Sequence, residues 1–180
     1  MIVGNHGRID FAINNAGFEG ELAPFEQYAD DIFRKVIEVD LIGVFNCMKA
    51  EIRQMKEQGF GAIACTASIC SFVGLKDFSA YNAAKHGVMG LVRSATAELA
   101  ASGVRINAVC PGFIETPMTT DRGLKATPGS ELYEQIAATL PNLRWGQPEE
   151  MAEVFAWLCS DASSMVNGHG LVADAGYLTV

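Results

Sequence analysis

Four short apolar segments, each closed by small or polar residues, constrain the fold of this sequence more than any other feature. They occupy residues 9–14, 62–66, 104–112 and 170–176. Runs of this kind are typical of strands that are covered on both faces. Stretches with helical features separate them, at residues 30–58, 79–101, 130–140 and 147–161. The alternation therefore predicts an α/β fold, in which a doubly wound parallel sheet carries helices on both faces.

Local signals place the ends of the helices. Residues 30–58 repeat apolar side chains at three- and four-residue spacing up to Gly59, so we expect one long amphipathic helix there. We expect the helix at 79–101 to end before Gly103, and the next two to begin at Ser130 and Pro148. Residues 113–130 lack a sustained period. A loop of that length is usually functional or mobile, and we interpret it as a substrate lid.

The strand ends predict where a ligand binds. In an open parallel sheet, ligands lie beyond the carboxyl ends of the strands. These ends are residues 14–17, 66–68, 110–112 and 174–176, and most of them are small or polar. Such residues allow a ligand to approach the backbone closely.

Charge and cysteine content argue against several other classes of protein. The 180 residues have a formal net charge of −8, which disfavours nucleic acid or an anionic membrane as the main partner. We see neither a membrane-spanning apolar run nor a signal-peptide pattern. The five cysteines include no CxxC pair and the three histidines lie far apart, so we expect no metal site and no disulfide scaffold. Buried, reduced cysteines favour a cytoplasmic protein.

The segment "SAYNAAKHG" places Tyr81 and Lys85 four residues apart, on one face of a helix. A nearby ammonium favours the phenolate and should lower the tyrosine pKa. Such a phenol can exchange a proton with an alcohol or carbonyl oxygen. Ser68, at the end of the preceding strand, could hold the same oxygen. On spacing alone, a surface helix pair with a core-facing tyrosine is the favoured interpretation.

Several motifs, in order, resemble the short-chain dehydrogenase/reductase family over nearly the whole chain. They are "GRIDFAINNAG", "TASICSFVGLKDFSAYNAAKHGV", "GVRINAVCPGFIETPM" and "RWGQPEEMAEVFAWLCSDASSMVNGHGLVADAG". The resemblance implies a Rossmann-type fold and hydride transfer between NAD or NADP and a small secondary alcohol or ketone. It implies that Tyr81 is the acid/base, that Lys85 tunes its pKa and binds the nicotinamide ribose, and that Ser68 positions the reacting oxygen. It also implies a homodimer or homotetramer.

The resemblance further implies a set of cofactor-binding residues besides Tyr81 and Lys85. Asn14, Ala16 and Gly17 would lie along the adenosine side, and Pro111, Gly112, Ile114 and Thr116 would border the nicotinamide. Asp40 stands where the family usually has an asparagine that supports a water in a proton relay. We expect Asp40 to belong to the catalytic set; a solvated or helix-bonded carboxylate is the alternative interpretation. Its negative charge would neutralise part of the effect of Lys85 on Tyr81.

The pattern also departs from the family at the beginning of the sequence. Family members begin with a strand, a glycine-rich turn and a helix that bind the pyrophosphate. No G-x-x-x-G-x-G precedes the strand at residues 9–14. We therefore expect residues 1–180 to form one partial NAD(P)-binding domain that lacks the N-terminal βαβ cofactor half. Two interpretations remain open: a shortened oxidoreductase, or an inactive fragment that acts as a dimerisation or binding module.

Overall fold

The computed structural model describes residues 2–99 and 101–180 and confirms the predicted fold class. Its four strands are β1 (Phe11–Asn14), β2 (Gly61–Thr66), β3 (Val104–Pro111) and β4 (Gly170–Ala173). They form one parallel sheet in the order β1-β2-β3-β4. All four overlap the apolar segments identified in the sequence. The carboxyl ends of the strands therefore meet at one edge, as the site prediction requires.

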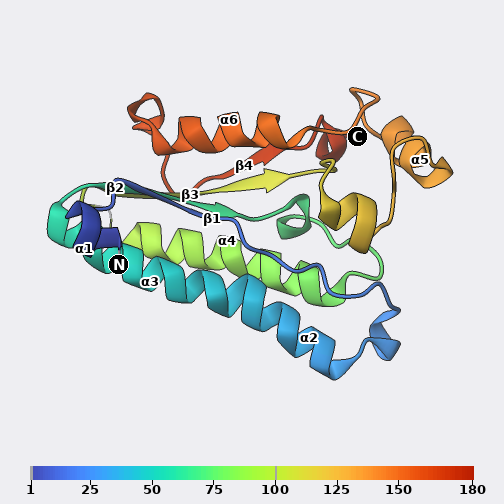
Figure 1. The fold of residues 1–180 in the computed structure, drawn as a ribbon, viewed down its shortest axis with the longest axis horizontal. Coiled ribbons are helices and arrows are strands. Elements are labelled where there is room, and N and C mark those ends of the chain that lie inside the picture. Colours follow the sequence, from blue (N-terminus) through green and yellow to red (C-terminus); the bar gives the residue numbers. More distant parts are fainter. Residues whose placement is uncertain (1, 100) are drawn as a thin grey trace.

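Helices cover both faces of the sheet (Figure 1). Helices α3 (Val44–Gln58) and α4 (Ser79–Leu99) lie on one face, and α6 (Pro148–Cys159) lies on the other. Alternate residues of β2 serve the two faces: Ile63 belongs to the core under α3 and α4, whereas Ala64 packs with α6. This period-2 division explains why the strands are apolar at consecutive positions.

The helix expected over residues 30–58 has an interruption that the sequence did not reveal. It consists of α2 (Asp30–Ile37), a π-helical segment (Glu38–Gly43) and α3. It ends at Gly59, which has a φ of 78°, as expected for a glycine that terminates a helix. Apolar residues continue at three- and four-residue spacing through the π segment, so the pattern alone cannot detect the extra residue in that turn.

The other helices agree with expectation at most of their boundaries. Helix α4 ends at Leu99, and the predicted extension to residue 101 passes through Ala100, which lies outside the described residues. The Ser130 hydroxyl accepts a hydrogen bond from the Tyr133 N–H and caps α5 (Glu131–Thr139). Pro148 occupies the first turn of α6. A short helix, α1 (Ile2–His6), precedes β1, and the loop before α5 contains a π-helical turn at Met118–Arg122.

Candidate active site

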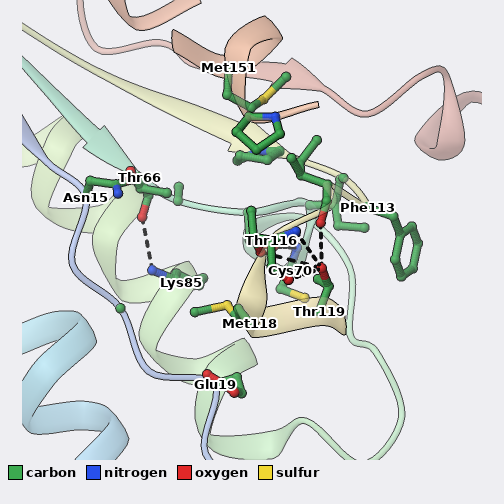
Figure 2. Close-up of a pocket in the computed structure, with 18 of the residues that line it drawn as sticks. Asn15, Glu19, Thr66, Cys70, Lys85, Phe113, Thr116, Met118, Thr119 and Met151 are labelled. Carbon is green, nitrogen blue, oxygen red and sulfur yellow. Dashed lines mark hydrogen bonds between the residues drawn. The ribbon is translucent and has the colours of Figure 1, made fainter. Parts of the chain in front are cut away.

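A cavity of about 910 Å³ lies at the carboxyl ends of the strands (Figure 2). The loops after β1, β2 and β3 line it, together with the beginning of α4 and one face of α6. Ser68, Tyr81 and Lys85 all line this cavity. Tyr81 and Lys85 share α4, whereas Ser68 follows β2, so it is the meeting of Ser68 with this pair that depends on the fold.

Lys85 is buried, with only 2% of the residue exposed. Its Nζ donates a hydrogen bond to the Thr66 carbonyl oxygen at 3.0 Å, at the end of β2. The same Nζ lies 3.1 Å from Asp40 Oδ2 and 5.2 Å from the centroid of the Tyr81 ring. The ammonium is therefore fixed between a strand end, a carboxylate and the phenol.

Asp40 is fully buried in the π-helical segment and contacts the site from behind Lys85. Its Oδ1 accepts the Phe18 backbone N–H at 2.7 Å, which ties the loop after β1 to the helix. Its Oδ2 makes an ion-pair contact with Lys85 but lacks the geometry of a hydrogen bond to any described residue. A Cβ on Gly17 would lie 3.2 Å from this Oδ2, so the loop passes close to the ion pair.

The pKa of Tyr81 is raised, not lowered as the sequence predicted. Burial of the phenol is the main cause, and the negative charges associated with Cys70 and Asp40 act in the same direction. The Ser68 hydroxyl opposes them, and the Glu19 carboxylate adds a further increase. The Lys85 ammonium is paired with Asp40, so much of its effect on the phenol is offset.

The predicted cofactor residues separate into two groups. Ala16, Gly17, Pro111, Gly112, Ile114 and Thr116 all line the cavity. Asn14 does not: its Nδ2 donates to Glu51 Oε2 at 2.9 Å, on the side of the sheet covered by α3. Its neighbour Asn15 lines the cavity instead and accepts a hydrogen bond from the Thr66 hydroxyl at 2.7 Å. Consecutive residues at a strand end point to opposite sides, and the doubled asparagine concealed which one faces the cavity.

Hydrogen bonds order the loop after β3. The Thr119 hydroxyl donates to the Ile114 carbonyl oxygen at 2.6 Å and accepts the Thr116 N–H at 3.1 Å (Figure 2). At the start of this loop, a Cβ on Gly112 would lie 2.8 Å from the Cα of Asp174, which follows β4. The glycine permits this close approach of the loop to the end of β4.

Sequence reasoning missed Glu19, a buried carboxylate on the wall of the cavity. It precedes a glycine in an irregular loop, where neither periodicity nor a motif marks its side chain as functional. Met118 was assigned to the lid, and the structure places it on the cavity wall.

Two kinds of feature are absent from the described residues. Within residues 2–99 and 101–180, we find no cluster of three His, Cys, Asp or Glu side chains that could hold a metal ion. Among the helices described in this structure, none combines the length and apolar character needed to cross a membrane.

Comparison with known proteins gives consistent results. A family model described as enoyl-(acyl carrier protein) reductase matches residues 1–178. Cis-4-hydroxycyclohexanecarboxylate dehydrogenase of Sinomonas cyclohexanicum is 43% identical over 174 residues, which cover 97% of this chain and 68% of the relative. Cyclohexanol dehydrogenase of Acinetobacter sp. (strain SE19) is 42% identical over 176 residues, covering 97% and 66%. The chain thus spans about two thirds of the length of these relatives.

Solved structures show the same fold. The crystal structure of levodione reductase superposes with a TM-score of 0.93 at 37% identity, covering 99% of this chain and 70% of that one. A gluconate 5-dehydrogenase from Burkholderia cenocepacia J2315, in complex with NADP and tartrate, has a TM-score of 0.92 at 30% identity, covering 99% and 68%. An NAD⁺-bound xylitol dehydrogenase has a TM-score of 0.87 at 33% identity, covering 95% and 70%. With the family model and the relatives above, these matches establish that the chain belongs to the short-chain dehydrogenase/reductase family.

Proposed function

We propose that this protein is an oxidoreductase that transfers a hydride between NAD or NADP and a small secondary alcohol or ketone. The observation that carries the proposal is the convergence of Ser68, Tyr81 and Lys85 on one cavity at the carboxyl ends of a parallel sheet. Similar structures that hold NADP or NAD⁺ support the choice of cofactor. We further propose a cyclic substrate, because two relatives are named for cyclohexanol and for a hydroxycyclohexanecarboxylate.

The residues that line the cavity fit the nicotinamide end of such a cofactor. Gly17 and Gly112 let the cavity wall pack closely against the Asp40–Lys85 pair and against Asp174, and Lys85 offers an ammonium donor to a ribose hydroxyl. Ile114 and Thr116 border the same space, with the loop held by Thr119. The cofactor, when bound, supplies or accepts the hydride. The roles of the protein are to orient both reactants and to move one proton.

Tyr81 is the group proposed to move that proton. A raised pKa keeps the phenol protonated near neutral pH, so it can donate its proton to the oxygen of a ketone as the carbonyl carbon receives hydride. In the oxidation direction the phenol must first lose its proton, and that reaction should therefore accelerate as the pH rises. Ser68 can hold the substrate oxygen between its hydroxyl and the phenol.

We also propose a homodimer or homotetramer in the cytoplasm. The outer side of the long helix exposes three large apolar side chains, Val39, Ile42 and Phe45, at positions that fit a helix-mediated contact between copies. All five cysteines are free, and three of them are buried, which suits a reducing compartment.

The proposal is tested by replacing Tyr81 with phenylalanine, which keeps the ring and removes the ionisable oxygen. Turnover of cyclohexanone with NADH or NADPH should fall roughly 10²–10⁴-fold. Tyr177→Phe makes the same chemical change outside the cavity and is the control. Retention of near-normal turnover in Tyr81→Phe would contradict the assignment. A folded wild-type chain without any NAD(P)-dependent turnover would instead favour a binding or dimerisation module.

A further inference from the structure

We propose that Glu19 forms a substrate subsite, which accepts a hydrogen bond from a second hydroxyl or ammonium group of the substrate and excludes a carboxylate there. The inference rests on the proposed function, since it specifies the substrate of the same cavity. In Figure 2, Glu19 lies beyond Met118, at the end of the drawn cluster opposite Met151. Its charge acts on the phenol of Tyr81, so both ends of a small substrate could be held within one cavity.

Glu19 has no internal partner that accounts for its burial. Only 6% of the residue is exposed, and Oε2 is buried without a hydrogen-bond partner among the described residues. Oε1 faces Arg122 Nε at 3.8 Å, but the Arg122 side chain is 61% exposed. A long ion pair with a solvent-exposed arginine contributes little. A buried carboxylate without donors is costly, and a ligand that supplies one would relieve that cost.

The backbone on both sides of Glu19 is fixed, so its side chain is held in place before a ligand binds. On one side, the Phe18 N–H donates to Asp40 Oδ1 at 2.7 Å. On the other, Gly20 has a φ of 77°, and a Cβ there would lie 2.4 Å from the Tyr28 hydroxyl oxygen and 2.7 Å from Val36 Cγ2. The loop therefore packs tightly against α2, and Glu19 projects in the other direction, into the cavity.

The loop after β3 closes over the same carboxylate. A Cβ on Gly123 would lie 3.0 Å from Glu19 Cγ and 3.5 Å from Oε1. Met118, Gly123 and Leu124 line the cavity beside it. A substrate group that reaches Glu19 would thus be enclosed by the lid. In such surroundings, a charge-assisted hydrogen bond discriminates strongly between substrates that carry a donor and substrates that lack one.

The test measures binding of four probes that differ only at one ring position. They are cyclohexanol, trans-1,4-cyclohexanediol, trans-4-aminocyclohexanol and trans-4-hydroxycyclohexanecarboxylate. Affinities of the full chain are measured by calorimetry at pH 7, with and without NAD⁺. We expect the diol or the amine to bind at least about 10-fold more tightly than cyclohexanol, and the carboxylate to bind most weakly. The diol and amine arms distinguish a neutral donor from a cationic one.

Glu19→Gln removes the charge with little change in volume. It should reduce the preference for the amine about 10-fold or more and improve binding of the carboxylate. Glu26→Gln removes the same charge from an exposed position outside the cavity and is the matched control. Arg122→Gln tests whether Glu19 acts as a substrate subsite or only as the ion-pair partner of Arg122. If Glu19 is a subsite, Arg122→Gln should preserve or increase the preference for probes that carry a donor. If the ion pair is purely structural, Arg122→Gln should have the same effect as Glu19→Gln.

Thermal unfolding of the ligand-free variants provides a second readout. Because the Glu19 carboxylate lacks a donor, Glu19→Gln should melt at the wild-type temperature or higher. Probe preferences that are unchanged in Glu19→Gln, or a wild-type chain that binds none of the probes, would overturn the inference. If the probe preferences depend on Glu19 but the chain shows no turnover, the subsite is supported and the proposed reaction is refuted.

Discussion

Replacing Asp40 with asparagine removes one half of a buried ion pair and keeps most of the surrounding contacts. The amide oxygen can still accept the Phe18 N–H, and Lys85 retains its hydrogen bond to Thr66. What is lost is the negative charge 3.1 Å from Nζ, so the ammonium remains buried without a counterion. Breaking such a pair from one side costs about 3–5 kcal/mol, and the retained hydrogen bonds place this variant near about 3 kcal/mol.

For a chain of this size, 1 kcal/mol shifts the melting temperature by about 2–4 °C, so Asp40→Asn should melt about 6–12 °C below wild type. Circular dichroism melts at pH 7 measure this shift. Lys85→Met and the double variant complete a cycle in which the double variant should lose less stability than the sum of the two single changes. An Asp40→Asn melting temperature within about 1 °C of wild type, or strict additivity in the cycle, would refute the reasoning.

Activity should respond differently from stability. The charge of Asp40 raises the pKa of Tyr81, so its removal should lower that pKa. In ketone reduction the protonated phenol is required, and the rate falls as the pH rises through the pKa. The alkaline limb of the reduction profile should therefore move to lower pH in Asp40→Asn, with turnover near neutral pH unchanged or higher. A limb that moves to higher pH would contradict the electrostatic role.

Three further predictions concern two glycines of the scaffold and the cysteines. Gly103→Ala should destabilise the protein by more than about 2 kcal/mol in urea unfolding, because φ is 75° and the new Cβ would lie 2.1 Å from the Gly59 carbonyl oxygen. Gly90→Ala, in open space on the exposed side of α4, should stabilise it by about 0.5–1 kcal/mol. At pH 8, a thiol reagent should modify exposed Cys47 in the folded chain but spare Cys65, because burial raises the pKa of its thiol to about 12. Equal labelling rates for the two thiols would contradict this.

Most of the fold could be predicted from the sequence because it depends on periodicity. A buried strand and an amphipathic helix each impose a repeating apolar pattern, and each observed strand overlaps a predicted one. Helix ends were equally readable where a single residue determines them, as at Gly59 and Ser130. The π-helical segment could not be predicted, because one additional residue in a turn leaves the apolar spacing within its ordinary variation.

The residues of the candidate site could be predicted where residue types and their order along the chain identify them. Properties of the site that depend on burial could not be predicted as well. Ser68, Tyr81 and Lys85 line one cavity as expected. The direction of the Tyr81 pKa was wrong, because desolvation of the phenol outweighs a lysine that is already paired. Glu19 was missed for a related reason: the sequence does not indicate that an isolated glutamate in a loop is buried without a donor.

The π-helical turn that carries Asp40 also has a mechanical consequence for how this chain tolerates insertions and deletions. A π-helical turn holds one residue more than an α-helical turn, so the helices on its two sides keep the relative orientation of an uninterrupted α-helix that is one residue shorter. Deleting one residue within Glu38–Gly43 would leave a continuous helix of nearly the same length. The face of α2 that packs beneath Gly20 would keep its direction toward the loop bearing Glu19. A deletion there would therefore leave the packing of both flanking helices in place and remove the wide turn that presents Asp40 to Lys85 and to the Phe18 N–H.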